Sequence, residues 1–290
     1  MRFSVVVPTY NRVSTLRLCL RSLLAQDYPD YEIIVVDDGS TDSTPETLAQ
    51  EFPPEFRRLC YLRQKNAGPA VARNQGIQAA TGEIVAFTDD DCLAPPDWLT
   101  QLAAGYTRHS EVVGVGGGLS APPEILATNP YAQYERYIAR VIYQVGETES
   151  LGGFECPAGG TANMSYRKSS LKAVHGFDQA FPVAAGEDAD LKMRLCQQGH
   201  RLLYVPVQVV HLQDYTWERF KQQCYVRGVG RNYFEQRHGA GAPSRFKIGL
   251  RVFRRLLAFP SDLWRMPNKK LAFIKLTEGL ITCLGQWNGK

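Results

Sequence analysis

The sequence predicts an α/β protein with a mostly parallel central sheet flanked by helices, followed by a helical C-terminal extension. In the first half of the chain, short β-branched runs alternate with helical patterns, which is typical of successive β-α-β units. Several of these runs end in polar residues, as strands do at the edge of an open α/β sheet where ligands bind. Of the 290 residues, 44% are hydrophobic and 21% charged, so the chain has enough apolar material for a core.

The first half contains four strand-like runs that alternate with helical patterns. The runs lie at 3–10, 31–40, 60–64 and 83–91, and the helical patterns at 14–26, 43–52, 68–81 and 97–109. In the first helical pattern, Leu16, Leu20 and Leu23 fall on one face, and Ser14 can cap the N-terminus. Pro45 fits the first turn of the second helix, a position that tolerates a missing N–H.

The second half is less regular. Strand patterns occur at 112–119, 162–166 and 201–211, and helical patterns at 131–145 and 186–199. The second of these helices begins with acidic residues and ends at Gly199, an arrangement that the helix dipole favours. From Tyr215 onward the chain is predicted to be helical and basic.

Charge and cysteine content narrow the class of protein. Arg245–Lys290 holds ten basic and two acidic residues, so it carries +8 and leaves the rest of the chain at −4. This basic tail favours an anionic lipid surface over nucleic acid, because no basic groove with interleaved aromatic residues is present. Seven scattered cysteines without a C-x-x-C pair argue against a disulfide framework or a zinc site and favour a reducing compartment.

Two further observations argue against a membrane-spanning protein and against a dinucleotide-binding protein. No signal-peptide pattern precedes the first strand, and no run approaches the ~20 apolar residues that span a bilayer. The glycine-rich stretches at 114–118 and 228–230 do not complete G-x-G-x-x-G between a strand and a helix.

Three adjacent carboxylates, Asp89, Asp90 and Asp91, follow an apolar run that reads as a buried strand. Like charges this close repel one another and cost stability unless a cation or donors compensate them. Hard cations such as Mg²⁺ and Mn²⁺ take carboxylate oxygens and share a substrate's phosphates. We therefore favour a metal and phosphate site here over an ordinary acidic loop.

Other candidate residues leave two interpretations open. Asp37-Asp38 follows the second strand and either caps a helix or accepts hydrogen bonds from a base or ribose. Arg73 lies either on a solvated helix face or against a phosphate. Glu187-Asp188 supplies either charge at a helix N-terminus or a general base, and the sequence favours neither interpretation over the other. His211 ends a strand and is either structural or a third protein ligand for a metal.

The ordered set of motifs between Phe3 and His211 resembles the family 2 glycosyltransferases, which have the GT-A fold. The segments that carry this resemblance are "SVVVPTYNR", "IIVVDDGSTDST", "NAGPAVARNQGIQAATGEIVAFTDDDC", "GGTANMSYRKSSLKAVHGFDQAF" and "GEDADLKMRLCQQGHRLLYVPVQVVH". The resemblance implies a catalytic domain over 1–212, with a nucleotide-sugar-binding half at about 1–118 and an acceptor-side half at about 119–212. The basic extension at 213–290 lies outside it.

The resemblance also implies roles for individual residues in an inverting transfer from a nucleotide-diphosphate sugar, usually a UDP-sugar, with Mg²⁺ or Mn²⁺. Asp91 and His211 match the metal-binding positions, although Cys92 stands where related chains often have another Asp. Asp188 matches the catalytic base. The remaining matches lie on the nucleotide and substrate side and comprise Thr9, Asn11, Asp38, Arg73, Asp89, Asp90 and Glu187.

The expected partners are a nucleotide-sugar donor and a glycan or lipid-linked acceptor in polysaccharide, glycolipid or glycan synthesis, with no nucleic acid. The expected location is cytoplasmic. The tail is either a helical pair packed on the catalytic body or a peripheral attachment to the inner face of the cell membrane. Two rival functions are a sugar nucleotidyltransferase, which would need a glycine-rich basic N-terminal loop, and a non-catalytic nucleotide-sugar-binding protein.

Overall fold

The computed structural model describes residues 1–52, 58–239, 241 and 243–289. The chain forms two compact units. The first consists of Met1–Ser120, Tyr143–Gln179 and Asp188–Leu212, and the second of Ala121–Ile142, Ala180–Glu187 and Gln213–Lys290. The sequence-based boundary at residue 212 stays a prediction, since two earlier segments also belong to the second unit.

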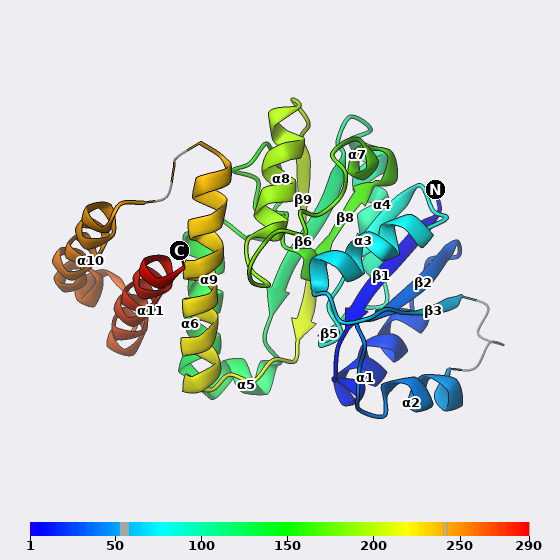
Figure 1. The fold of residues 1–290 in the computed structure, drawn as a ribbon, viewed down its shortest axis with the longest axis horizontal. Helices are drawn as coiled ribbons and strands as arrows, with labels where there is room; N and C mark the ends of the chain where they lie inside the picture. The colour runs from blue at the N-terminus through cyan, green and yellow to red at the C-terminus, as the bar shows by residue number, and fades with distance from the viewer. Residues whose placement is uncertain (53–57, 240, 242, 290) are drawn as a thin grey trace. The chain divides into compact units, whose positions relative to one another are not determined.

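Among the described residues of the first unit, nine strands form one sheet (Figure 1). They are β1 (Phe3–Thr9), β2 (Tyr31–Asp37), β3 (Leu59–Arg63), β4 (Ile84–Phe87), β5 (Cys92–Leu93), β6 (Gly114–Ser120), β7 (Ser150–Gly152), β8 (Met164–Arg167) and β9 (Leu202–His211). The strand order is β3-β2-β1-β4-β8-β6-β9-β5, and β7 also pairs with β9. Strands β1 to β4 are parallel, as are β6 and β9, whereas β8 runs antiparallel to both its neighbours.

Helices cover both faces of this sheet and bury two apolar layers. The helices of the first half are α1 (Val13–Leu24), α2 (Thr44–Glu51), α3 (Pro69–Ala79) and α4 (Trp98–Arg108), and those that follow are α7 (Lys168–Ala173) and α8 (Glu187–Gln197). Successive residues of a strand point to opposite faces. Val5 and Val7 of β1 accordingly pack in the layer with α1 and α4, and Val6 packs with α3 and α8. The predicted α/β fold with a mostly parallel sheet is confirmed.

The start of α1 differs from the sequence prediction. Ser14 lies inside the helix, which begins at Val13, and Asp42 supplies the capping oxygen instead. Its Oδ2 accepts from the amide of Val13 at 3.1 Å, and its Oδ1 accepts from the amide of Thr44 at 3.1 Å. One carboxylate from the β2–α2 loop therefore serves the first turns of two helices, a long-range contact that local capping rules do not include.

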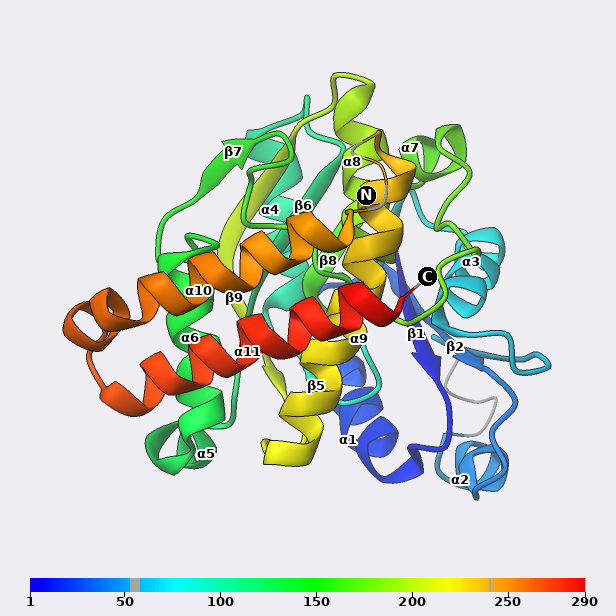
Figure 2. The same cartoon turned by 60° about the vertical axis from the view of Figure 1, so that its left-hand side comes forward.

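The second unit is helical throughout its regular structure. Its helices are α5 (Pro123–Thr128), α6 (Pro130–Val141), α9 (Trp217–Arg237), α10 (Arg245–Arg265) and α11 (Lys269–Asn288), which confirms the predicted C-terminal helices. Figure 2 shows α10 and α11 lying side by side. Gly228 of α9 faces Gly285 of α11, and a Cβ at Gly228 would overlap the carbonyl oxygen of Thr282. The glycines at 228 and 285 thus allow close helix packing.

Candidate active site

Three neighbouring strands end at one edge of the sheet, close to the candidate residues. Strands β2, β1 and β4 are adjacent and parallel, so their carboxyl ends share that edge. β1 ends at Thr9, and β4 ends two positions before Asp89. The amide of Asp38, just after β2, donates to the carbonyl of Thr9 at 2.9 Å. The polar ends that the sequence analysis singled out therefore meet in one place.

Asp90 is buried at this edge and is held from two sides. Thr9 Oγ1 donates to Asp90 Oδ2 at 2.7 Å, and Arg12 Nη1 donates to Asp90 Oδ1 at 3.1 Å. Burial raises the pKa of Asp90 to about 6; Arg12 and Thr9 oppose this rise, while the charges of Asp91 and Asp89 add to it. Asp90 can therefore exchange a proton near neutral pH, and a cation beside it would favour the ionised form.

Asp91 lies between an arginine and a histidine. Arg12 Nη1 donates to Asp91 Oδ2 at 2.7 Å, and His211 Nε2 lies 3.2 Å from Asp91 Oδ1. Burial alone would raise the pKa of Asp91, but the hydrogen bond and charge of His211, together with Arg12, hold it below its ordinary value. Asp91 is therefore an ionised carboxylate directed at an imidazole.

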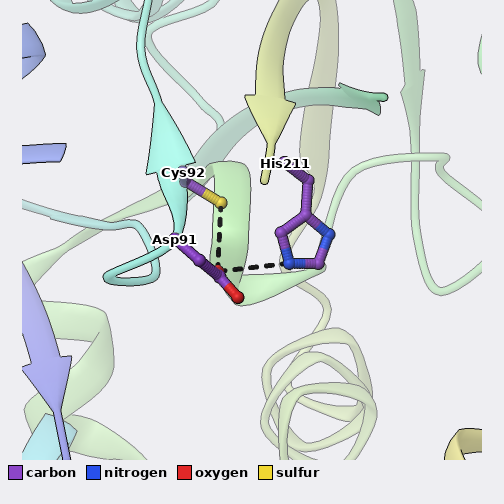
Figure 3. Close-up of side chains that lie close together, drawn as sticks. All are labelled: Asp91, Cys92 and His211. Carbon is purple, nitrogen blue, oxygen red and sulfur yellow. Dashed lines mark hydrogen bonds and ion pairs between the residues drawn. The ribbon is translucent and has the colours of Figure 1, made fainter. Parts of the chain in front are cut away.

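Asp91, Cys92 and His211 each offer one ligand atom, and these atoms lie within 4.8 Å of one another (Figure 3). Cys92 and His211 are opposite residues in the antiparallel β5–β9 pair, so their side chains share a face of the sheet. The carboxylate oxygen is the donor that Mg²⁺ and Mn²⁺ prefer, and the imidazole can add a second ligand. Burial raises the pKa of the Cys92 thiol and keeps it protonated, so Asp91 and His211 are the stronger donors. This donor set fits a divalent cation.

Asp89 and Asp188 both interact electrostatically with Arg73. The buried guanidinium of Arg73, on α3, donates from Nη2 to Asp89 Oδ1 at 3.0 Å. Burial raises the pKa of Asp188; the amide of Ala189 and the charge of Arg73 lower it, and the charge of Asp89 raises it. Asp188 is thus a more basic carboxylate than an ordinary aspartate, within electrostatic range of an arginine.

The carboxylate of Asp38 is occupied by the loop that leads into α3. It accepts from the backbone amides of Ala67 and Gly68, each at 2.8 Å, and from Gln64 Nε2 at 2.7 Å. Gly68 is the residue immediately before α3, with φ at 91°. Asp38 therefore shapes this edge through its loop contacts, and its predicted contact with a base or ribose stays a prediction.

Asn11 also organises a loop at the same edge. Its φ is 54°, and its Oδ1 accepts from the amides of Thr41 and Asp42 at 2.7 and 3.2 Å. Glu187, the first residue of α8, has a buried side chain and belongs to the second unit. For both residues a substrate contact stays a prediction.

Sequence analysis missed Arg12, which pairs with two of the three aspartates. A signal was present, because Arg12 follows Thr9 by three positions in the segment that leaves β1 at this same edge. What the sequence could not supply was the direction of its side chain, which depends on the β1–β4 register.

The glycine-rich segment before β8 is fixed by two buried side chains. Lys192 of α8 donates from Nζ to the carbonyl of Ala158 at 2.7 Å and also to that of Cys156. Asn163 Nδ2 donates to the carbonyls of Gly118 and Val207 at 2.8 and 3.1 Å, while its Oδ1 accepts from the indole of Trp98 at 2.8 Å. The segment is therefore held by hydrogen bonds to α8, β6 and β9.

The glycines of β6 have a packing explanation. A Cβ at Gly117 would overlap the carbonyl of Val207, and one at Gly116 would overlap the side chain of Met164. Glycine at these positions lets β6 approach β9 and β8 closely, with a register irregularity between Gly116 and Gly118. The rejection of a dinucleotide motif here agrees with this packing role.

The sheet topology and the aspartate-rich edge define a protein of the GT-A type. Residues 4–174, more than half of the chain, match the family described as Glycosyl transferase family 2. The chain therefore belongs to glycosyl transferase family 2, as the sequence resemblance indicated.

Similar proteins of known sequence agree with this family. The chain is 29% identical over 204 residues to Glycosyltransferase AglE of Haloferax volcanii, covering 69% of this chain and 63% of AglE. It is 37% identical over 115 residues to Glycosyltransferase GlyA of Streptococcus pneumoniae, covering 40% of this chain and 16% of GlyA. The chain thus spans less than two thirds of the length of either curated relative.

Two solved structures share the fold. The mannosyltransferase PcManGT from Pyrobaculum calidifontis, in complex with GDP-Man and Mn²⁺, superposes with a TM-score of 0.69 at 20% identity and covers 100% of this chain and 88% of that one. S. aureus TarS 1-349 superposes with a TM-score of 0.53 at 20% identity and covers 98% of this chain and 90% of that one.

Among the residues that the structure describes, each helix is too short or too polar to cross a bilayer.

Proposed function

We propose that this protein is an inverting glycosyltransferase that moves a sugar from a nucleotide-diphosphate donor to an acceptor hydroxyl. One observation carries the proposal: each of the three aspartates at the sheet edge faces a basic side chain, namely Arg73 for Asp89, Arg12 for Asp90, and both Arg12 and His211 for Asp91. Such a mixture of acids and bases suits a diphosphate and a cation together. Membership of glycosyl transferase family 2 supports the same reaction class.

Asp188 is the proposed general base. Its pKa is raised by burial, so it accepts a proton more readily than an ordinary aspartate does. It would take the proton of the acceptor hydroxyl as that oxygen attacks the anomeric carbon, and the bond to the diphosphate would break on the opposite side. A single displacement of this kind inverts the anomeric centre.

Arg73 and Arg12 are the proposed counter-charges for the leaving diphosphate. Negative charge grows on the leaving group in the transition state, and preorganised cations stabilise it. Asp91 and His211 would hold Mg²⁺ or Mn²⁺, which supplies Lewis-acid stabilisation of the phosphate oxygens when bound. Thr9, Asp38 and Asn11 would line the nucleoside side of the same edge.

The donor nucleotide, acceptor and location complete the proposal. Uridine is our first candidate base, and the GDP-Man of PcManGT makes guanosine the second. The acceptor would be a glycan or a lipid-linked sugar of a polysaccharide or glycolipid pathway, reached at an anionic membrane surface through the basic C-terminal segment. The seven cysteines are all free thiols, which supports a cytoplasmic location.

The test is a donor panel. Hydrolysis of UDP-, GDP- and TDP-sugars with Mn²⁺ would be followed by release of nucleoside diphosphate, alongside thermal shift of the protein. We expect at least one donor to be hydrolysed and to raise the melting temperature, and EDTA or Asp91→Ala to weaken both effects. Binding without hydrolysis across the panel would favour the non-catalytic alternative. Binding and turnover that survive EDTA unchanged would contradict the metal site.

A further inference from the structure

Helix α10 presents its apolar residues to solvent. Phe246 is 80% exposed, Leu257 64% and Trp264 92%. Together with Leu250 and Phe253 they recur at intervals of three, four and seven residues, so they form one stripe along the helix. Contiguous apolar side chains on a surface usually mark a site of association.

The inward side of α10 carries both apolar and polar groups: Ile248 is buried, and Phe259 and Leu263 pack against the apolar cluster of the helical unit. Arg251 donates two hydrogen bonds to the carboxylate of Glu235 on α9, at 2.9 and 3.0 Å, and another to Gln286 on α11 at 2.9 Å. Asp262 pairs with Lys275 of α11 at 2.7 Å. The inward side of the helix is therefore mixed, and the stripe is an additional apolar surface on the side that an ordinary surface helix keeps polar.

The charges that flank the stripe all have one sign. Lys247, Arg254 and Arg265 are exposed on α10, and Lys269 and Lys270 are exposed at the start of α11. The one acid of α10, Asp262, is the residue paired with Lys275. A second copy of this face would place cations against cations, whereas an anionic phospholipid surface complements both the charge and the apolar stripe.

We infer that α10 is an interfacial membrane-binding helix that inserts Phe246, Leu250, Phe253, Leu257 and Trp264 among anionic lipids. The inference rests on the proposed function only for its biological purpose, delivery of the enzyme to a membrane-borne acceptor. Its 21 residues extend about 30 Å as a helix, and four of the five stripe residues precede the interior Pro260, so that part of the stripe can lie parallel to a bilayer surface.

Vesicle sedimentation tests the inference with the full chain. Vesicles of phosphatidylcholine alone and of phosphatidylcholine with phosphatidylglycerol would be mixed with the wild type and with the triple variant Phe253→Ser, Leu257→Ser, Trp264→Ser. We expect binding to the anionic vesicles that weakens with salt, and at least a tenfold weaker partition for the variant. The matched control is Leu18→Ser, which makes the same kind of substitution at an exposed leucine of α1. This variant should bind vesicles as the wild type does.

Two further variants separate charge from insertion. Replacing Lys247, Arg254 and Arg265 together by Gln should weaken binding to anionic vesicles, while Lys172→Gln on α7 should not. Trp264→Phe should keep sedimentation but lose most of the blue shift in tryptophan emission on vesicle addition, because Trp264 is 92% exposed, whereas Trp98 is buried and Trp217 and Trp287 lie outside α10.

Three outcomes would overturn the inference. They are equal binding to neutral and anionic vesicles, undiminished binding by the triple serine variant with native circular dichroism, and a wild-type dimer that the variant dissociates without any vesicle binding. The Asp188→Asn variant keeps the test independent of catalysis, since it should bind vesicles as the wild type does even if the proposed reaction is wrong.

Discussion

The aspartate-rich edge of the sheet and helix α10 depart from ordinary residue placement in opposite ways. At the edge, charged carboxylates are buried, but each has a partner from its own chain. On α10, a whole stripe of apolar side chains is exposed, while Arg251 and Asp262 make inward polar contacts beside the buried Ile248. The first departure is compensated inside the molecule, whereas the second would be compensated by the lipid surface that we infer for α10. Mutations should therefore affect folding and activity at the edge, and association at α10.

The largest effect is expected for Asp188→Asn. An amide keeps the shape of the side chain but cannot take the acceptor proton, so transfer should fall by about 10²- to 10⁴-fold. Donor affinity, measured by calorimetry, should stay within a factor of a few. The matched control is Asp30→Asn, an exposed aspartate before β2 that should leave the rate unchanged. Near-normal transfer by Asp188→Asn would remove Asp188 from the role of base.

Arg12→Met should destabilise the fold, because it leaves the buried Asp90 and Asp91 without their shared cation. Loss of one partner of a buried ion pair costs several kcal/mol, but Arg12 is 40% exposed and partly screened, so we expect about 1–2 kcal/mol. Urea unfolding measures this loss.

A second variant tests whether that cost is electrostatic. Adding Asp90→Asn to Arg12→Met should restore part of the stability, since it removes one of the two carboxylates that have lost the arginine. If the double variant is less stable than Arg12→Met by the full cost of Asp90→Asn alone, the two side chains are not coupled and the compensation described above is wrong.

The pH dependence of transfer provides a smaller but directional effect. Asp188 must be ionised to act as a base, so the rate should rise with pH through its raised pKa and level off above it. The charge of Arg73 lowers that pKa and the charge of Asp89 raises it. The inflection of the kcat profile, measured at saturating donor and Mn²⁺, should therefore move to higher pH in Arg73→Met and to lower pH in Asp89→Asn. An inflection common to all three proteins would refute the assignment.

The smallest effect is expected for folding stability after changes on α10. Phe253→Ser and Leu257→Ser remove side chains that are already largely exposed, so the free energy of unfolding should change by no more than about 0.5 kcal/mol. By contrast, Leu20→Ala in the buried face of α1 should cost about 2–5 kcal/mol. A large destabilisation by the α10 changes would mean that the stripe packs within the chain.

Much of the sheet could be predicted because its signals are local. Short β-branched runs that alternate with helical patterns predicted the order of elements, and the polar strand ends placed Thr9, Asp38 and the aspartates at one edge. Strand β5 was not predicted, because Cys92-Leu93 is too short to show periodicity. It forms through its pairing with Val210 and His211.

The hydrogen-bond partners of the site residues and the orientation of α10 could not be predicted from the sequence, for a different reason. Arg12 and Asp42 act over 29 to 79 positions of sequence, so their partners depend on register and loop path. The sequence also shows that α10 is amphipathic without showing which face turns inward. In the structure the inward side holds Ile248 together with the contacts of Arg251 to Glu235 and Gln286, and the stripe of larger apolar side chains lies outside.

The pairing of β5 with β9 has an entropic consequence for ion binding. Asp91 and His211 come from distant parts of the chain, but their backbones are fixed beside each other. Cys92 pairs with His211 in the β-ladder, and the amide of Leu212 donates to the carbonyl of Asp91 at 2.7 Å. The conformational freedom that two separate loops would lose when an ion arrives is here lost during folding. A residue inserted into the turn between Asp89 and Cys92 should therefore weaken Mn²⁺ binding even if every ligand is kept.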